Sequence, residues 1–198
     1  MPCAAAAESP NPPDPAALLR TLARPAPSAT AFVEIRGSAL LKQPLRISGQ
    51  YRRPDRDTLV REVRAPYRET TTLAGGQAVI EREGKPQQRY SLERVPELAG
   101  IQSSFGALLD GDAQALQRQY DVSAQGTPQH WQLSLQPRDP ALRKRVLAVK
   151  LYGDDGELRC IATQPARGEI QRTVLGAAAQ AVEAGAVPEA LCELRASP

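Results

Sequence analysis

The sequence predicts an α+β fold, an antiparallel meander of about eleven strands with short helices at its start and in its middle. Apolar and polar residues alternate along short runs between turn residues, most clearly at Leu45, Ile47, Gly49 and Tyr51. After Pro96 the apolar residues recur at helical spacing, and the alternation later returns. A sheet made of such strands has one apolar face, which must be buried.

A short amphipathic helix is expected to open the fold. Asp14 suits the N-cap position and Pro15 the first helical position, and Leu18, Leu19 and Leu22 then share one side. Strands follow at nearly regular spacing, separated by Gly- and Pro-containing turns. The first six are expected at Thr30–Gly37, Leu45–Arg53, Thr58–Arg64, Tyr67–Leu73, Gln77–Glu83 and Gln88–Val95.

Two helices are expected between the two sets of strands. The first carries Leu98, Ile101, Phe105, Leu108 and Leu109 at helical spacing. The segment from Asp110 to Asp112 ends it and caps a second helix, Ala113–Gln119. The remaining strands are expected at Tyr120–Ala124, Gln129–Gln136, Leu147–Tyr152, Glu157–Thr163 and Glu169–Leu175.

Length and composition predict one domain with a sizeable core. The chain has 198 residues, and 25 Lys and Arg stand against 22 Asp and Glu without forming a basic stripe, which argues against nucleic-acid binding. Two Phe, one Trp and five Tyr are few, so a cavity would be lined by aliphatic groups that suit acyl chains. No apolar run is long enough to cross a bilayer.

The two ends of the chain differ from its middle. Residues 1–13 resemble the last part of a secretory signal followed by a Pro-rich start, and an Ala-rich disordered N-terminus is the alternative. Residues 14–175 form the predicted domain, and residues 176–198 are an Ala-rich tail that is either a marginal helix or a mobile arm. Cys160 and Cys192 could form a disulfide or remain two buried thiols.

The order of elements and several short motifs resemble the periplasmic outer-membrane lipoprotein carriers, the LolA-like proteins. The motifs are Phe32-x-Glu34, Gly49-x-Tyr51-x-Arg53-Pro54, Leu109-x-Gly111-Asp112, Trp131-x-Leu133-x-Leu135-x-Pro137 and Gly153-x-Asp155-Gly156. The resemblance spans Pro15 to Leu175. It implies a strongly curved antiparallel half-barrel covered by short helices.

The resemblance also implies a function and a site. Such a carrier would bind the acyl chains of a lipid or lipidated protein under a helical lid, without a cofactor. It would act as a periplasmic monomer with transient inner-membrane donor and outer-membrane acceptor proteins. Arg53 matches the family's arginine that holds the lid closed by hydrogen bonds to it. The residues expected to line the ligand site are Val33, Ile35, Leu45, Ile47, Tyr51, Val63, Ile80, Leu98, Ile101, Phe105, Leu108, Leu109, Trp131 and Leu133.

Enzymatic and metal-binding functions find little support in the sequence. The single histidine, His130, falls on the polar side of its strand, where we expect it to be exposed rather than part of a catalytic group. Asp110 and Asp112 lack the further oxygen ligands of a cation loop. The alternative to a carrier is a non-catalytic accessory or scaffold protein of an envelope or polyene-lipid pathway, with its barrel filled by side chains.

Overall fold

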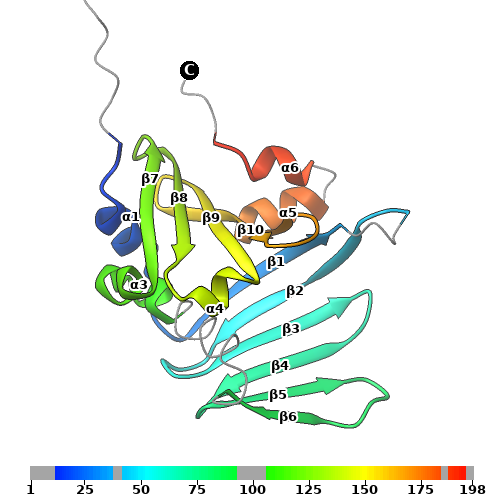
Figure 1. Cartoon of the computed structure of the whole chain (residues 1–198). Helices are drawn as coiled ribbons and strands as arrows, with labels where there is room; N and C mark the ends of the chain where they lie inside the picture. The colour runs from blue at the N-terminus through cyan, green and yellow to red at the C-terminus, as the bar shows by residue number, and fades with distance from the viewer. Residues whose placement is uncertain (1–11, 38–41, 93–105, 184–186, 195–198) are drawn as a thin grey trace, which may run out of the picture.

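One sheet organises the molecule. The computed structural model describes residues 12–37, 42–92, 106–183 and 187–194. Eleven strands lie in the order β6-β5-β4-β3-β2-β1-β11-β10-β9-β8-β7, and each pairs antiparallel with its neighbours. Two consecutive meanders, β1 to β6 and β7 to β11, join where Phe32 of β1 pairs with Leu175 of β11 (Figure 1). The predicted fold class is therefore confirmed.

The strands follow the predicted alternation closely. Their bounds are β1 (Ser28–Arg36), β2 (Leu45–Arg53), β3 (Leu59–Ala65), β4 (Glu69–Ala74), β5 (Gln77–Arg82), β6 (Gln88–Ser91), β7 (Tyr120–Gly126), β8 (His130–Pro137), β9 (Val146–Asp154), β10 (Glu157–Pro165) and β11 (Gln171–Leu175). The helices are α1 (Pro15–Thr21), α3 (Ala113–Gln119), α4 (Pro140–Arg143), α5 (Gly176–Glu183) and α6 (Pro188–Leu191). Residues 106–110 are also helical.

Short polar side chains begin the helices where the sequence predicts. The Asp14 carboxylate accepts hydrogen bonds from the backbone N–H groups of Ala16 and Ala17, both at 3.1 Å. Asp112 accepts one from Ala115 at 2.8 Å at the start of α3. These bonds satisfy donors that the first helical turn leaves without partners.

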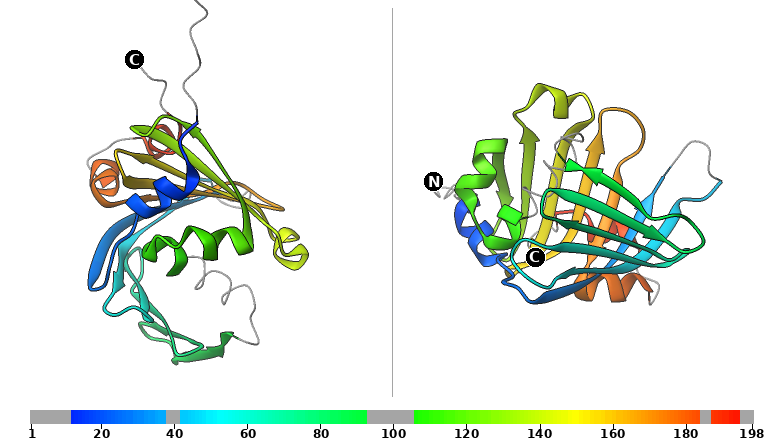
Figure 2. Two further views of the ribbon diagram at one scale, coloured as in Figure 1. Left: turned by 90° about the vertical axis from the view of Figure 1, so that its left-hand side faces the viewer. Right: turned by 90° about the horizontal axis from the view of Figure 1, so that it is seen from below.

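The sheet curls, and helices lie on both of its sides. Figure 2 shows α1, α3 and the helical residues 106–110 inside the curve, with α5 on the outer side. The main apolar core fills the inside and draws on both meanders. It contains Leu18, Leu19, Leu22, Phe32, Ile47, Val63, Ala107, Leu108, Leu116, Tyr120, Trp131, Leu133, Leu135, Leu151, Ile161 and Leu175. A Cβ on Gly153 would lie 2.0 Å from the Trp131 ring, so only glycine leaves room for the buried indole there.

A second core lies on the outer side, under α5. It joins Val33, Tyr152, Cys160, Ala162, Val174, Ala179, Val182 and Cys192, with Ile35 packed against it. The Ala-rich tail is thus helical over α5, and a disulfide links Cys160 of β10 to Cys192 after α6. Val33 and Ile35, expected to line the ligand site, lie on this outer side. The expectation was wrong because β1 is buried on both faces, and α5 covers the face that carries Val33 and Ile35.

Candidate functional site

Two hollows border the helical residues 106–110: one lies inside the curve, and the second extends from Leu108 and Leu109 to Ala177 and Gln180 of α5. The first, here called the inner cavity, has a volume of about 330 Å³ and the second about 400 Å³. Tyr51, Leu108 and Ile161 line both hollows. The helical residues 106–110 therefore contribute directly to the walls.

Most of the inner cavity's wall is aliphatic. β8, β9 and β10 supply it through inward-facing side chains, because residues two apart along a strand point to the same face. α3 and α4 add leucines from the inside of the curve. The apolar lining consists of Leu108, Leu116, Leu135, Leu142, Val146, Val149, Leu151 and Ile161.

The opposite wall, on β1 to β3, is charged. The Glu34 carboxylate is 5% exposed and accepts a hydrogen bond from Nη2 of Arg61 at 2.7 Å. Arg36 forms a second, short ion pair with Glu34 through Nε. The Arg61 guanidinium also lies 4.9 Å from the centre of the Phe32 ring. The carboxylate is thus held between two arginines on neighbouring strands.

Tyr51 lies beside this ion pair, opposite Arg61 across β2 and β3. Burial raises the pKa of the Tyr51 hydroxyl, and the nearby Arg61 charge lowers it by less, so Tyr51 remains a neutral phenol. For Arg61, burial lowers the pKa, but Tyr51 and Glu34 outweigh it and raise the pKa overall. Arg61 therefore keeps its charge inside the half-barrel.

Arg53, the predicted latch, contacts the helical residues 106–110. Its Nη2 donates to Oδ1 of Asp110 at 2.6 Å and to the carbonyl of Arg56 at 3.1 Å, and its Nη1 donates to the carbonyl of Arg24 at 3.2 Å. The side chain is buried. Its partner on the helical segment is the Asp110 carboxylate.

Two arginines, Arg53 and Arg56, form ion pairs with the Asp110 carboxylate. Partial burial raises the pKa of its carboxyl, but the hydrogen bond and charge of Arg53 and the weaker contact from Arg56 at 3.4 Å outweigh it. The pKa of Asp110 therefore lies below its ordinary value. From the sequence Asp110 is expected only to end a helix, because its partner Arg53 is 57 residues away along the chain.

The predicted lining residues fall into three groups. Tyr51 and Leu108 line both hollows, and Leu109 lines the second. Ile47, Trp131 and Leu133 are fully buried in the inner core, outside both linings, and Val63 packs there as well. Leu45 is exposed at the start of β2, and Ile80 is half-buried on β5. Leu98, Ile101 and Phe105 lie outside the described residues.

Glu34 and its arginines were missed as part of the site. Glu34 follows Phe32 by two residues, so the two point to the same face of the strand. A carboxylate on the core face of an apolar strand is a signal for a buried ion pair. Its partners Arg36 and Arg61 could not be identified from the sequence, since exposed arginines on the same strands look alike.

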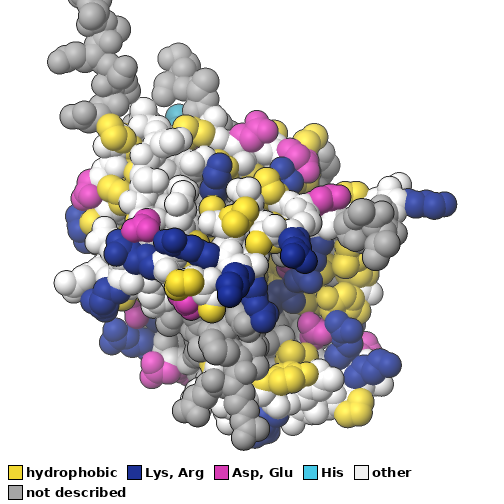
Figure 3. All heavy atoms as spheres, viewed as in Figure 1, with side chains coloured by type: hydrophobic (Ala, Val, Ile, Leu, Met, Phe, Trp, Pro, Cys, Tyr) yellow, Lys and Arg dark blue, Asp and Glu magenta, His cyan; other side chains and the backbone are white. Residues whose placement is uncertain are grey.

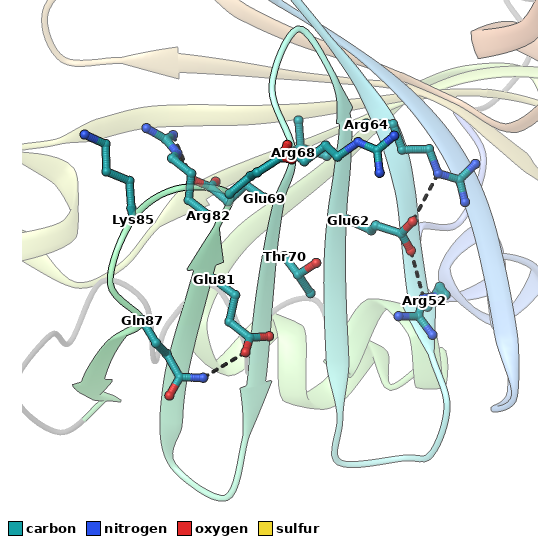
Figure 4. Close-up of a pocket in the computed structure, with 12 residues that line it drawn as sticks. Arg52, Glu62, Arg64, Arg68, Glu69, Thr70, Glu81, Arg82, Lys85 and Gln87 are labelled. Atoms are coloured by element: carbon teal, nitrogen blue, oxygen red, sulfur yellow. Dashed lines mark hydrogen bonds and ion pairs between the residues drawn. The ribbon is translucent and has the colours of Figure 1, made fainter.

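A larger hollow of about 720 Å³ lies over strands β2 to β5 and has a different character. Figure 4 shows Glu62 between Arg52 and Arg64, and Gln87 bonded to Glu81. Val63 is the one apolar residue among the described residues of its lining. Acidic and basic groups pair with each other there, so this groove offers no surface for an acyl chain.

The described residues show no arrangement suited to a metal ion, since no three His, Cys, Asp or Glu among them come together for one. His130 is half-buried, with Nδ1 3.0 Å from Oδ1 of Asp154, so the expectation that it is exposed was wrong. No helix in the described ranges has the length and apolar character needed to cross a membrane.

Several solved structures are distantly similar to this chain. No match was found among curated proteins. Among solved structures, a LolA superfamily protein from Nitrosomonas europaea aligns with 12% identity and a TM-score of 0.41, over 81% of this chain and 90% of that one. MucB aligns with 18% identity and a TM-score of 0.41, over 91% of this chain and 61% of that one. MucB in complex with MucA(peri) aligns with 20% identity and a TM-score of 0.36, over 93% of this chain and 63% of that one.

The family assignment comes from the sequence itself. A family model described as "Outer membrane lipoprotein carrier protein LolA-like" matches residues 5–197. That match extends beyond both ends of the Pro15 to Leu175 resemblance and includes the segment that forms α5 and α6. The predicted resemblance is confirmed, and the protein belongs to the LolA-like family.

Proposed function

We propose that the protein is a periplasmic carrier that binds the acyl chain of a lipid or lipidated protein in the inner cavity and moves it between membranes. The observation that carries this proposal is an aliphatic cavity of about 330 Å³ inside the curve of the sheet. Its volume lies within the range of small-molecule sites, and each buried CH₂ of an acyl chain contributes about 0.8 kcal/mol to binding. Family membership and a disulfide that suits an oxidising compartment support the proposal.

In this proposal Arg53 holds the helical residues 106–110 against β2 while a ligand is bound. Its three described acceptors lie on the α1–β1 connection, on the β2–β3 turn and on Asp110. A guanidinium can join three segments because it offers five donors in one plane. Donor and acceptor proteins of the two membranes would contact the carrier transiently, through small interfaces.

Displacement of cis-parinaric acid, a fluorescent fatty acid, tests the carrier function, together with native mass spectrometry of the gently purified protein. We expect saturable binding to the wild type and weaker binding to Val149→Phe, because Val149 lines the inner cavity and a phenyl ring there fills it. Leu147→Phe on the same strand is the matched control, since Leu147 is exposed and lies outside that lining. A wild-type protein that takes up no apolar ligand in either assay is not a carrier.

The second candidate function is that of a non-catalytic accessory protein. The observation in its favour is that Ile47, Trp131 and Leu133, expected to line the site, are instead fully buried in the inner core and reduce the space left for a ligand. A protein of this kind would bind a protein partner without carrying a lipid. Absence of parinaric acid binding, with an intact fold by circular dichroism, would favour this function.

A further inference from the structure

The inner cavity and the second hollow, of about 400 Å³, lie one after the other along the same strands. β1 contributes residues 29–31 to the second hollow and Glu34 and Arg36 to the inner cavity. β10 runs in the same direction as β1, because both pair antiparallel with β11. It contributes Leu158 to the second hollow and Thr163 to the inner cavity. The two hollows therefore follow each other along the strand direction.

Three side chains mark the boundary between the hollows, since Tyr51, Leu108 and Ile161 line both. They come from β2, from the helical residues 106–110 and from β10, so they border the boundary from different sides. The centres of the Tyr51 and Phe32 rings are 4.7 Å apart, which adds a second aromatic ring beside the boundary. An apolar chain that passes between the hollows would therefore meet mostly carbon surface.

The second hollow lies at a gap in the sheet that the shortness of β11 leaves. β11 ends at Leu175, opposite Phe32 of β1, so residues 28–31 of β1 extend beyond it. The chain then leaves the sheet at Gly176, whose φ of 56° favours glycine, and continues as α5. Ala177 of α5 lines the hollow as well. The hollow therefore reaches from the boundary residues to the helix on the outer side of the sheet (Figure 2).

The two hollows reach the surface at opposite ends of these strands. The inner cavity does so near α4 and the start of β11, where the exposed Arg145 and Gln171 line it. Figure 3 shows a hollowed surface on the face on which α4 lies in Figure 1, with apolar and basic side chains beside one another. The second hollow does so near α5, where the exposed Ala177 and Gln180 line it. Together the hollows form a path along β1.

The length of this path decides which chains can use both hollows. The β1 segment from Ala29 to Arg36 is about 24 Å long, at about 3.4 Å per residue. One leaflet of a bilayer, half of a hydrocarbon core of about 30 Å, holds an acyl chain of about 15 Å. Such a chain is longer than half of the path. It would therefore cross the boundary from whichever end it enters.

We propose that the acyl chain runs through both hollows, across the boundary at Tyr51, Leu108 and Ile161, so that the protein selects chains long enough to fill the second hollow. This inference rests on the proposed carrier function and specifies its ligand class, long-chain acyl lipids. Each CH₂ that enters the second hollow exchanges water for an apolar lining, whereas a chain that ends before the boundary gains nothing from it. Leucines supply much of that lining, namely Leu22, Leu59, Leu109, Leu158 and Leu175.

The test measures how affinity depends on chain length, by isothermal titration calorimetry with decanoic and hexadecanoic acid below their micelle concentrations. The two acids share a headgroup and differ only in chain length. We expect the wild type to bind hexadecanoic acid at least about a hundredfold more tightly, since each buried CH₂ is worth about fourfold in affinity. Thr30→Phe should reduce this ratio to about tenfold or less, because Thr30 lines the second hollow and a phenyl ring there fills it. Decanoic acid, which the inner cavity can hold, should bind this variant within about twofold of the wild type.

Two further variants make the test specific. Thr72→Phe is the matched control and should keep the wild-type ratio, since Thr72 is a half-buried threonine on β4 that lines neither hollow. Ala177→Phe fills the second hollow from α5 and replaces an exposed residue. It takes the place of Thr30→Phe if circular dichroism shows that the latter does not fold.

The outcomes separate this inference from the carrier function. Similar affinities of the wild type for the two acids, or the full ratio in the folded variant with a filled second hollow, would overturn the inference and leave the carrier function intact. Similar affinities would also result if the gap beside β11 held a peptide strand instead of an acyl chain. Failure of the wild type to bind either acid would overturn both.

Discussion

Glu34 is the residue with the least ordinary surroundings, a carboxylate buried on the concave side of β1 and held by Arg36 and Arg61. A buried charge of this kind is tolerated only while it stays paired and hydrogen-bonded. Glu34 and its arginines also form part of the wall of the inner cavity, so the same carboxylate affects both the stability of the fold and the shape of the cavity.

Loss of Arg61 should therefore be costly. We expect Arg61→Met to lower the free energy of unfolding by about 3 kcal/mol, the lower end for breaking a buried pair, since Arg36 still contacts Glu34. Urea denaturation measures the change. Arg64→Met on the same strand is the control; its side chain is 59% exposed and pairs with Glu62, so the loss should stay below about 1 kcal/mol. Equal losses for the two variants would contradict the argument.

At Arg53 the expected effect is on ligand exchange. Arg53→Leu removes a charged hydrogen bond to Asp110, worth about 1.5 to 3 kcal/mol, and should speed the release of cis-parinaric acid several-fold with little loss of affinity. Arg53→Lys should restore little, because an ammonium group cannot join three segments in a plane. Stopped-flow displacement gives the rate. Arg56→Leu serves as the control, since the Arg56 side chain is 79% exposed and its contact with the same carboxylate is longer, at 3.4 Å. An unaltered release rate in Arg53→Leu would refute the role of Arg53 as a latch.

Through Asp110, the free energy of unfolding should depend on pH in a defined direction. Its pKa is lower in the folded protein, so the unfolded chain binds the proton more readily and pairing stabilises the fold above the ordinary carboxyl pKa of about 4. This contribution is lost as the pH falls through the folded pKa. The difference in unfolding free energy between wild type and Asp110→Asn should therefore be larger near pH 7 than near pH 3. A difference that grows toward low pH would reverse the assignment.

Among the elements, α5 and α6 depend most on the rest of the fold. α5 places Ala179 and Val182 in the outer core, while α6 is only four residues long and lies next to the disulfide of Cys192. A helix this short is not stable by itself. The position of α6 thus depends on the covalent link to β10 and on packing against the outer core.

Removal of the disulfide should loosen this arm first. The bond spans 32 residues, and replacing both cysteines by serine should lower stability by about 2 to 4 kcal/mol. Limited proteolysis should then cut near residues 187–194 well before the sheet. The parent protein with dithiothreitol should behave like the double variant, and wild-type protein without reductant is the reference. Identical cleavage rates in all three would show that packing alone holds the arm.

At the scale of the whole molecule, the sheet is unevenly supported. β1 is buried on both sides by Phe32 and Val33, whereas β4 to β6 rest on a small cluster of Leu73, Ala78 and Leu92. Local opening free energies follow the amount of buried apolar contact. The central strands and the outer meander should therefore differ in their protection.

Amide hydrogen exchange can measure that difference. We expect the slowest exchange in β1, β10 and β11 and the fastest strand exchange in β5 and β6, because the central strands have cores on both faces. Saturation with cis-parinaric acid should slow exchange in the strands that line the inner cavity, β8 to β10. Uniform protection across all eleven strands would contradict this reading of the fold.

Alternation and turn residues were sufficient to predict most of the architecture. The eleven strands, the caps at Asp14 and Asp112 and the order of elements follow from local periodicity, since strand and helix spacing are properties of neighbouring residues. The motif resemblance also led us to expect that Arg53 hydrogen-bonds to a helical lid, and its role as a latch stays a prediction. Its contact with the segment after Pro96 was expected, although the acceptor turned out to be the Asp110 side chain.

Tertiary structure decided which face of each strand lies inside the curve of the sheet and which lies in the outer core. In β1 the neighbouring apolar residues Phe32 and Val33 must point to opposite faces of the sheet, but the sequence does not determine which of them faces the curve. Only the pairing of β1 with β11 and the docking of α5 settled that Val33 and Ile35 lie outside and Glu34 inside. The cavity has the same origin. Its walls come from strands at opposite ends of the chain, and the space left between them depends on the curvature of the sheet, which no local pattern specifies.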